Sequence, residues 1–146
     1  MIRTATREDV PALVAMGERF ADSPDYRLVL RNNPDQLAIT AEMLVTSEIG
    51  TMLVLESDRQ LVGMIGMVCM PHFLSGELFA GEVCWWVDPE HRGGGLRLMK
   101  AAEAWALARG ALTIQMIAPN ARVGQLYERL GYTWTESMYQ KACPHD

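Results

Sequence analysis

Three consecutive glycines, Gly93 to Gly95, separate an apolar segment from a strongly helical one in the stretch VDPEHRGGGLRLMKAAEAWA. Glycine loses more backbone entropy on folding than any other residue, so such a cluster usually serves a positive φ or the close approach of a ligand. A strand, a glycine-rich turn and a helix can direct free N–H groups and the positive end of a helix dipole at a phosphate. The stretch has neither GxGxxG nor GxxxxGK[ST], which excludes a dinucleotide fingerprint and a P-loop. The glycines alone leave a phosphate cradle and a loose connection equally open.

Four other side chains could transfer a proton. Glu82 stands in the strand-like segment AGEVCWWV, where burial would raise the pKa of its carboxyl toward the range of a general base. An outward-facing glutamate explains the same pattern. Tyr127 falls on an apolar helical stripe, as a core aromatic or as a phenol that donates a hydrogen bond. His72 and His91 are eligible by their ordinary pKa and rank below Glu82.

Composition excludes several classes of protein. The three cysteines, Cys69, Cys84 and Cys143, include no CxxC pair, so neither a disulfide framework nor a metal site is predicted and a cytoplasmic location is expected. A net charge of −5 argues against a nucleic-acid partner. The longest apolar runs are too short to span a membrane, and the first residues do not resemble a signal peptide.

The chain of 146 residues suits a single domain, residues 1–146. Hydrophobic periodicity and turn residues predict ten elements in the order β-α-α-β-β-β-α-β-α-β. The predicted strands are 2–6, 51–56, 61–70, 78–87, 112–117 and 132–140. The predicted helices are 6–20, 35–48, 96–110 and 120–131. Hairpin-linked strands followed by βαβ crossovers imply an α/β fold with a central mixed sheet flanked by helices.

Two motifs within this frame resemble one family. The segment Arg92-Gly93-Gly94-Gly95-Leu96-Arg97 is similar to the R/Q-x-x-G-x-G/A signature of the GNAT N-acetyltransferase superfamily. The segment NARVGQLYERLGY, with Asn120 and Tyr127 seven residues apart, is similar to the N-x-x-A-x-x-LYEKLGF segment of that family. The order of elements also matches, so the resemblance covers Met1 to about Lys141. Two positions depart from the pattern: Arg97 stands where Gly or Ala is usual, and Val123 where Ala is usual.

The resemblance implies acetyl-CoA as co-substrate and no metal. Arg92 and the N–H groups of Gly93 to Arg97 would hold its pyrophosphate, and Asn120 belongs to the expected cofactor-binding set. A bulge at Trp86 and Val87 would part that strand from its neighbour and free backbone groups to pair with the pantetheine arm. The Arg97 guanidinium would suit a phosphate, because its forked donors match that geometry.

The family further implies direct transfer of an acetyl group to a primary amine in a ternary complex. Glu82 is the expected base, and Tyr127 would protonate the departing thiolate. The acceptor, a small molecule, a peptide or a protein, would meet residues 18–36 and 71–77. The exposed final strand would allow a homodimer. The alternatives are a catalytically silent acyl-CoA sensor or regulatory module and a generic phosphate-binding α/β protein.

Overall fold

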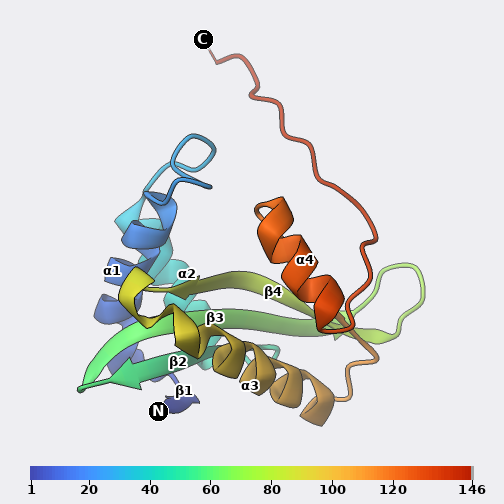
Figure 1. The fold of residues 1–146 in the computed structure, drawn as a ribbon, viewed down its shortest axis with the longest axis horizontal. Coiled ribbons are helices and arrows are strands. Elements are labelled where there is room, and N and C mark those ends of the chain that lie inside the picture. The colour runs from blue at the N-terminus through green and yellow to red at the C-terminus, as the bar shows by residue number, and fades with distance from the viewer. Residues whose placement is uncertain (146) are drawn as a thin grey trace.

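The computed structural model describes residues 1–145 as a five-stranded sheet with helices on both faces (Figure 1). The strands are β1 (Ile2–Thr4), β2 (Gly50–Ser57), β3 (Gln60–Pro71), β4 (Leu78–Val87) and β5 (Thr113–Gln115). The helices are α1 (Val10–Ala21), α2 (Pro34–Thr46), α3 (Gly95–Ala108) and α4 (Ala121–Arg129). The sheet order is β1-β2-β3-β4-β5, with antiparallel pairs up to β4 and a parallel pair of β4 with β5. The predicted mixed α/β sheet is therefore confirmed.

The helix boundaries follow local sequence signals. Asn33 and Asn120 begin α2 and α4, where their side chains accept hydrogen bonds from the N–H groups of Gln36 and Val123. Gly110 and Gly131 follow α3 and α4 with φ of +82° and +93°, a left-handed conformation that glycine adopts without steric strain. The sequence therefore determines where these helices begin and end.

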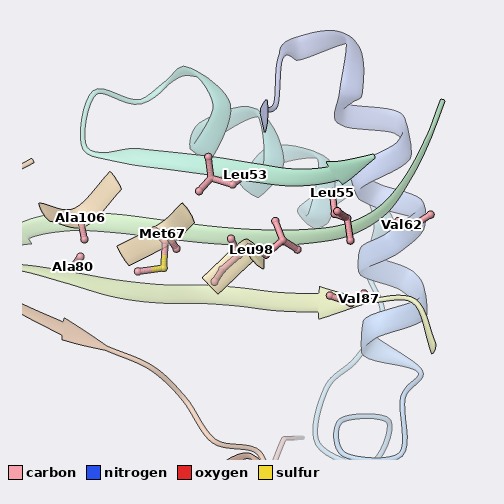
Figure 2. Packing of buried hydrophobic residues seen from close by; sticks show 10 residues of the cluster. Leu53, Leu55, Val62, Met67, Ala80, Val87, Leu98 and Ala106 are labelled. Carbon is pink, nitrogen blue, oxygen red and sulfur yellow. The ribbon is translucent and has the colours of Figure 1, made fainter. Parts of the chain in front are cut away.

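The core has two layers, one on each face of the sheet. Strand side chains alternate between them, since Leu53 and Leu55 join the α3 layer while Met52 and Val54 join the α1 and α2 layer. Figure 2 shows the α3 layer, formed by Leu53, Leu55, Val62, Ile65, Met67, Ala80, Val87, Leu98, Ala102 and Ala106. The other layer consists of Ala5, Leu13, Met16, Ala41, Leu44, Met52, Val54 and Met64. Both layers hold the sheet, and with it β4, in a fixed position.

The predicted final strand, residues 132–140, is wrong. These residues form no strand, and the chain after α4 runs away from the body of the molecule (Figure 1). A strand needs a neighbour to complete its hydrogen-bond ladder, and this segment does not reach β5, which remains the sheet edge. The structure therefore offers no final strand through which the expected homodimer could form among the described residues. The strand predicted at 112–117 is also shorter, covering Thr113–Gln115.

Candidate functional site

The two predicted proton-transfer residues, Glu82 and Tyr127, lie near the point where β4 and β5 separate. The two strands pair only over Phe79–Gly81 and Thr113–Gln115. Beyond this point β4 continues to Val87, while the segment that follows β5 leads to α4. Within residues 1–145, the outer edge of β4 from Glu82 onward therefore has no strand partner. Its backbone groups on that edge are free to pair with an extended ligand.

The irregularity in β4 lies earlier than the resemblance implied. The register of β3 with β4 pairs Gly66 with Cys84 and Met67 with Glu82, which leaves Val83 unopposed. The expected bulge at Trp86 and Val87 is therefore wrong in position. A bulge bends its strand and increases the local twist, so one at Val83 redirects β4 two residues after Gly81, the last residue paired with β5.

Glu82 lies at the point of separation and is half-buried. Its Oε2 accepts a hydrogen bond of 3.0 Å from the N–H of Ile117, in the segment between β5 and α4. Burial raises the pKa of Glu82 to about 7, and the hydrogen bond from Ile117 acts in the opposite direction. The carboxyl therefore titrates near neutral pH, which suits a group that accepts and releases a proton.

Tyr127 reaches the same segment from α4. Its side chain is buried, and its hydroxyl donates a hydrogen bond of 3.0 Å to the carbonyl oxygen of Ile117. Ile117 therefore forms hydrogen bonds with both side chains: its N–H donates to Glu82, and its carbonyl oxygen accepts from Tyr127. Burial, together with the nearby Glu82 charge, raises the pKa of Tyr127 above its ordinary value. The phenol therefore keeps its proton at physiological pH.

Trp85 and Trp86 lie on opposite faces of β4, as the alternation of a strand requires. Trp85 stacks on Tyr127 with 6.0 Å between ring centroids, and its buried indole N–H has no hydrogen-bond partner among the described residues. Trp86 donates from Nε1 to Oδ1 of Asp88 at 2.9 Å. An unpaired buried donor is uncommon in folded proteins, so the Trp85 N–H is a candidate contact for a bound ligand.

The three glycines do not form an irregular loop. Gly93 and Gly94 end a 3₁₀ turn, and Gly95 is the first residue of α3. Residues Pro89–Gly94 form a 3₁₀ turn that leads directly into Gly95, and no φ in Gly93–Gly95 is positive. A Cβ on Gly94 would lie 2.3 Å from Cδ2 of Leu55, whereas a Cβ on Gly93 would meet nothing within 4 Å. A side chain on Gly94 would therefore force the end of Leu55 to move, while Gly93 has an open surface beside the helix start.

The remaining predicted phosphate ligands surround this turn. Arg92 places its guanidinium 5.7 Å from the ring centroid of Trp86, and Leu96 and Arg97 are exposed. No side chain caps the start of α3, and its first turn holds no acidic residue. The N–H of Gly95 already donates to the carbonyl oxygen of Arg92, so an anion at this turn would meet the other N–H groups, which no side chain caps.

Asn120 stabilises the start of α4 in this structure. It caps α4, and its Nδ2 donates to Oδ2 of Asp25 at 3.2 Å. Asp25 precedes Tyr26, whose pKa is raised by burial and then by the charges of Glu82 and Asp25. The sequence did not single out Tyr26, although an aromatic in the polar segment ADSPDYR was the available signal. The loop after α1 thus approaches both Glu82 and the start of α4.

The other candidates lie away from Glu82 or are unsuited to catalysis. His72 packs on Phe73 and Phe79 at the opposite end of β4, and His91 lies in the 3₁₀ turn before α3. Burial raises the pKa of Cys84 to about 12, so its thiol is not a nucleophile at neutral pH. Residues 1–145 contain no cluster of potential metal ligands and no helix both long and apolar enough to cross a membrane.

Comparison with known proteins agrees with this geometry. The model of the acetyltransferase (GNAT) family matches residues 15–132. The chain therefore belongs to the GNAT acetyltransferase family. No curated protein sequence matches it.

Solved structures share the whole fold at low sequence identity. A transcriptional regulator from Bacillus halodurans is 22% identical, with a TM-score of 0.80 and coverage of 98% of this chain and 99% of that one. A ribosomal-protein-alanine N-acetyltransferase from Brucella melitensis is 20% identical, with a TM-score of 0.74 and the same two coverages. An aminoglycoside antibiotic 6'-N-acetyltransferase from Acinetobacter haemolyticus is 16% identical, with a TM-score of 0.77 and coverages of 100% and 99%. These similarities show the fold and leave the acceptor undefined.

Proposed function

We propose that this protein transfers the acetyl group of acetyl-CoA to a primary amine. The observation that carries the proposal is the parting of β4 from β5, which brings Glu82 and Tyr127 to the two sides of Ile117. A carboxyl that titrates near neutrality and a phenol that stays protonated stand together there. Such a pair supports proton removal from one reactant and proton delivery to the other.

Three features of the chain fit the co-substrate. The uncapped start of α3 and the open face of Gly93 suit a pyrophosphate, with Arg92 and Arg97 as further cationic donors. The free edge of β4 at Trp86 and Val87 suits the amide groups of an extended pantetheine arm, as an added strand does. The unpaired Trp85 N–H offers one more donor. Bound acetyl-CoA supplies the thioester.

In the proposed reaction, Glu82 accepts a proton from the acceptor ammonium and so exposes the nitrogen lone pair. The nitrogen forms a bond to the acetyl carbon, and the bond from that carbon to sulfur breaks. The second proton of the former ammonium passes to solvent, as does the proton held by Glu82, which restores the carboxylate. The departing thiolate takes a proton from Tyr127, which then regains one from solvent. Much of the rate enhancement would come from holding both reactants in reach of each other. Cys84 plays no covalent part, because its thiol is protonated.

Thermal unfolding with acetyl-CoA, CoA and ATP in parallel tests the binding half of this proposal. A ligand at about 100 times its dissociation constant adds about 2.7 kcal/mol to the stability of the native state. We expect acetyl-CoA and CoA to raise the melting temperature and ATP to have little effect. An equal effect of ATP would contradict the proposal and favour a generic phosphate site.

Thiol release from acetyl-CoA in the presence of amines tests the catalytic half. We expect CoA thiol to appear in proportion to acetylated amine, which mass spectrometry identifies. Binding of acetyl-CoA with no product from any amine in a broad screen would instead identify a catalytically silent acyl-CoA-binding module.

A further inference from the structure

An ion pair connects α1 with the end of β4. Arg19 of α1 donates from Nε to Oδ1 and from Nη2 to Oδ2 of Asp88, each at 2.9 Å. A guanidinium that donates two parallel hydrogen bonds fixes the orientation of a carboxylate. The two residues are 69 positions apart in the sequence, and the fold brings α1 beside the turn that leads from β4 to α3 (Figure 1). The proton transfers of the proposed reaction use neither side chain.

The Asp88 carboxylate also holds the side chain of Trp86. Its Oδ1 accepts a hydrogen bond of 2.9 Å from the indole Nε1. Phe20 of α1 packs against the same indole, with 5.9 Å between ring centroids. The main-chain N–H of Asp88 donates to the carbonyl oxygen of Val62 at 2.8 Å. The carboxylate is therefore held by its own backbone and by Arg19, and it holds the indole in turn.

The pair keeps Asp88 ionised. Burial acts to raise the pKa of the Asp88 carboxyl, but the hydrogen bonds from Arg19 and Trp86 outweigh it and lower the pKa below its ordinary value. The carboxylate is therefore negative at neutral pH and accepts from both donors. Because the charges of Arg19 and Asp88 cancel, the pair adds no net charge beside the turn, and its effect on that turn is geometric.

Arg92 lies over the indole that this pair holds. Its guanidinium carbon is 5.7 Å from the centroid of the Trp86 ring, a distance at which a cation is attracted to the face of the ring. Among the described residues the Arg92 guanidinium has no carboxylate partner, so its donors are available to a ligand. A guanidinium already held on a ring loses less conformational freedom on binding than one that moves freely in solvent.

We propose that Arg19 and Asp88 are positioning residues for acetyl-CoA: they fix the Trp86 ring, on which Arg92 is held ready for the pyrophosphate. An α1 side chain thereby acts through Trp86 on the turn before α3. This inference rests on the proposed acetyl transfer for the identity of the ligand, but the position of Arg92 can be measured without any ligand.

A double-mutant cycle tests whether the pair acts through Arg92. The pair variant Arg19→Ala/Asp88→Ala removes one charge of each sign and is combined with Arg92→Gln. Calorimetry gives the dissociation constant of acetyl-CoA for each protein in the cycle. We expect Arg92→Gln to weaken binding about tenfold or more, because a charge-assisted contact is lost, and the pair variant to weaken it about fivefold. The combined variant should bind within about twofold of Arg92→Gln alone, since a pair that acts through Arg92 then has nothing left to position.

Arg7→Ala/Glu42→Ala is the matched control. Arg7 and Glu42 form another ion pair at 2.9 Å, between the 3₁₀ turn before α1 and helix α2, and its removal also leaves the net charge unchanged. We expect this variant to bind acetyl-CoA as the unmodified protein does. Thermal unfolding without ligand shows that each variant is folded.

NMR spectroscopy follows Arg92 in the protein without a ligand. The ring current of Trp86 moves the signals of side-chain protons that lie over its face to higher field, and their loss in Arg92→Gln assigns them. Arg19→Gln is the milder second variant, because it leaves Asp88 in place to accept from Trp86. We expect Arg19→Gln to reduce the displacement of the Arg92 signals and Arg7→Gln to leave it unchanged.

The outcomes separate this inference from the proposed function. Three results overturn the positioning role while acetyl-CoA binding stands: affinity losses that multiply in the combined variant, an unchanged affinity in Arg92→Gln, or Arg92 signals that Arg19→Gln does not move. Failure of the unmodified protein to bind acetyl-CoA overturns the proposed function. In that case the NMR comparison still decides whether Arg19 positions Arg92.

Discussion

At the scale of single residues, the chemistry depends on what surrounds each side chain. The Glu82 carboxyl has a pKa near 7 because it is removed from water, although one N–H from Ile117 stabilises its charge. The Tyr127 phenol is held protonated by the same burial. Burial thereby raises the pKa of both side chains within one small region.

The first prediction concerns Glu82→Gln. If Glu82 is the base, the substitution lowers the rate of amine acetylation by about 100-fold or more, and the rate of the unmodified protein rises with pH up to about 7. Acetyl-CoA protection should be retained. An acetylation rate within threefold of the unmodified protein would remove Glu82 from the mechanism.

The same substitution has a predicted effect on stability. The carboxyl pKa rises from an ordinary 4.5 to about 7 on folding, so between these values the folded state binds more protons than the unfolded state. Stability contributed by Glu82 therefore falls as pH rises through that window. We expect Glu82→Gln to raise the melting temperature at pH 8 and to have a smaller effect near pH 4.5, as measured by thermal denaturation at both values.

Trp85→Phe and Trp86→Phe form a matched pair, because each loses the same ring volume and one N–H. The Trp85 N–H is unpaired, whereas that of Trp86 is bonded to Asp88. We expect Trp85→Phe to weaken acetyl-CoA binding about five- to tenfold, measured by calorimetry. Trp86→Phe should lower the free energy of unfolding by about 1 kcal/mol more than Trp85→Phe does. Undiminished acetyl-CoA affinity in Trp85→Phe would show that its N–H makes no ligand contact.

At the scale of elements, neighbouring glycines of the turn before α3 differ in their surroundings. A Cβ on Gly94 would collide with Leu55, which is 6% exposed in the α3 layer of the core. A Cβ on Gly93 would project into open space. A side chain would therefore be hindered at Gly94 but not at Gly93.

The next prediction compares these two positions. Gly94→Ala is expected to destabilise the fold by about 1–3 kcal/mol, since Leu55 must shift within a packed layer. Gly93→Ala should leave the fold at least as stable and weaken acetyl-CoA binding, because the new methyl group occupies the approach to the helix start. Chemical denaturation and calorimetry measure the two effects. Unchanged acetyl-CoA affinity in Gly93→Ala would argue against a phosphate at this surface.

At the scale of the whole molecule, the packed body ends close to α4. Tyr132 still donates to Oε1 of Glu103 in α3 at 2.8 Å. Beyond it, Trp134, Met138 and Tyr139 are 70%, 87% and 94% exposed. Apolar side chains this exposed add little to stability, because they remain in contact with water.

Truncation after Thr133 tests this description. The shortened chain is expected to melt within about 2 °C of the full chain, as substitutions at exposed positions do. Differential scanning calorimetry at several protein concentrations gives the comparison. A decrease of more than 5 °C would show that the removed segment packs against the body or against a second copy of the chain.

Much of the fold was predictable from local patterns. Strand alternation, the N-cap Asn120 and the left-handed Gly110 and Gly131 are local requirements of backbone geometry. They predicted all four helices and the first four strands within a few residues. The segment 132–140 has the same alternation but finds no neighbour, because strand formation depends on a partner distant in sequence.

The sequence by itself determined the helix and strand order, the glycine-rich start of α3 and the presence of Glu82 and Tyr127 as proton-transfer candidates. Only the tertiary structure decided that both bind Ile117 and that Gly94 packs closely against Leu55. The physical reason is the distance along the sequence over which each kind of interaction acts. Backbone propensities act over a few residues, whereas burial, pKa and cavity charge arise from groups that the fold brings together from distant parts of the chain.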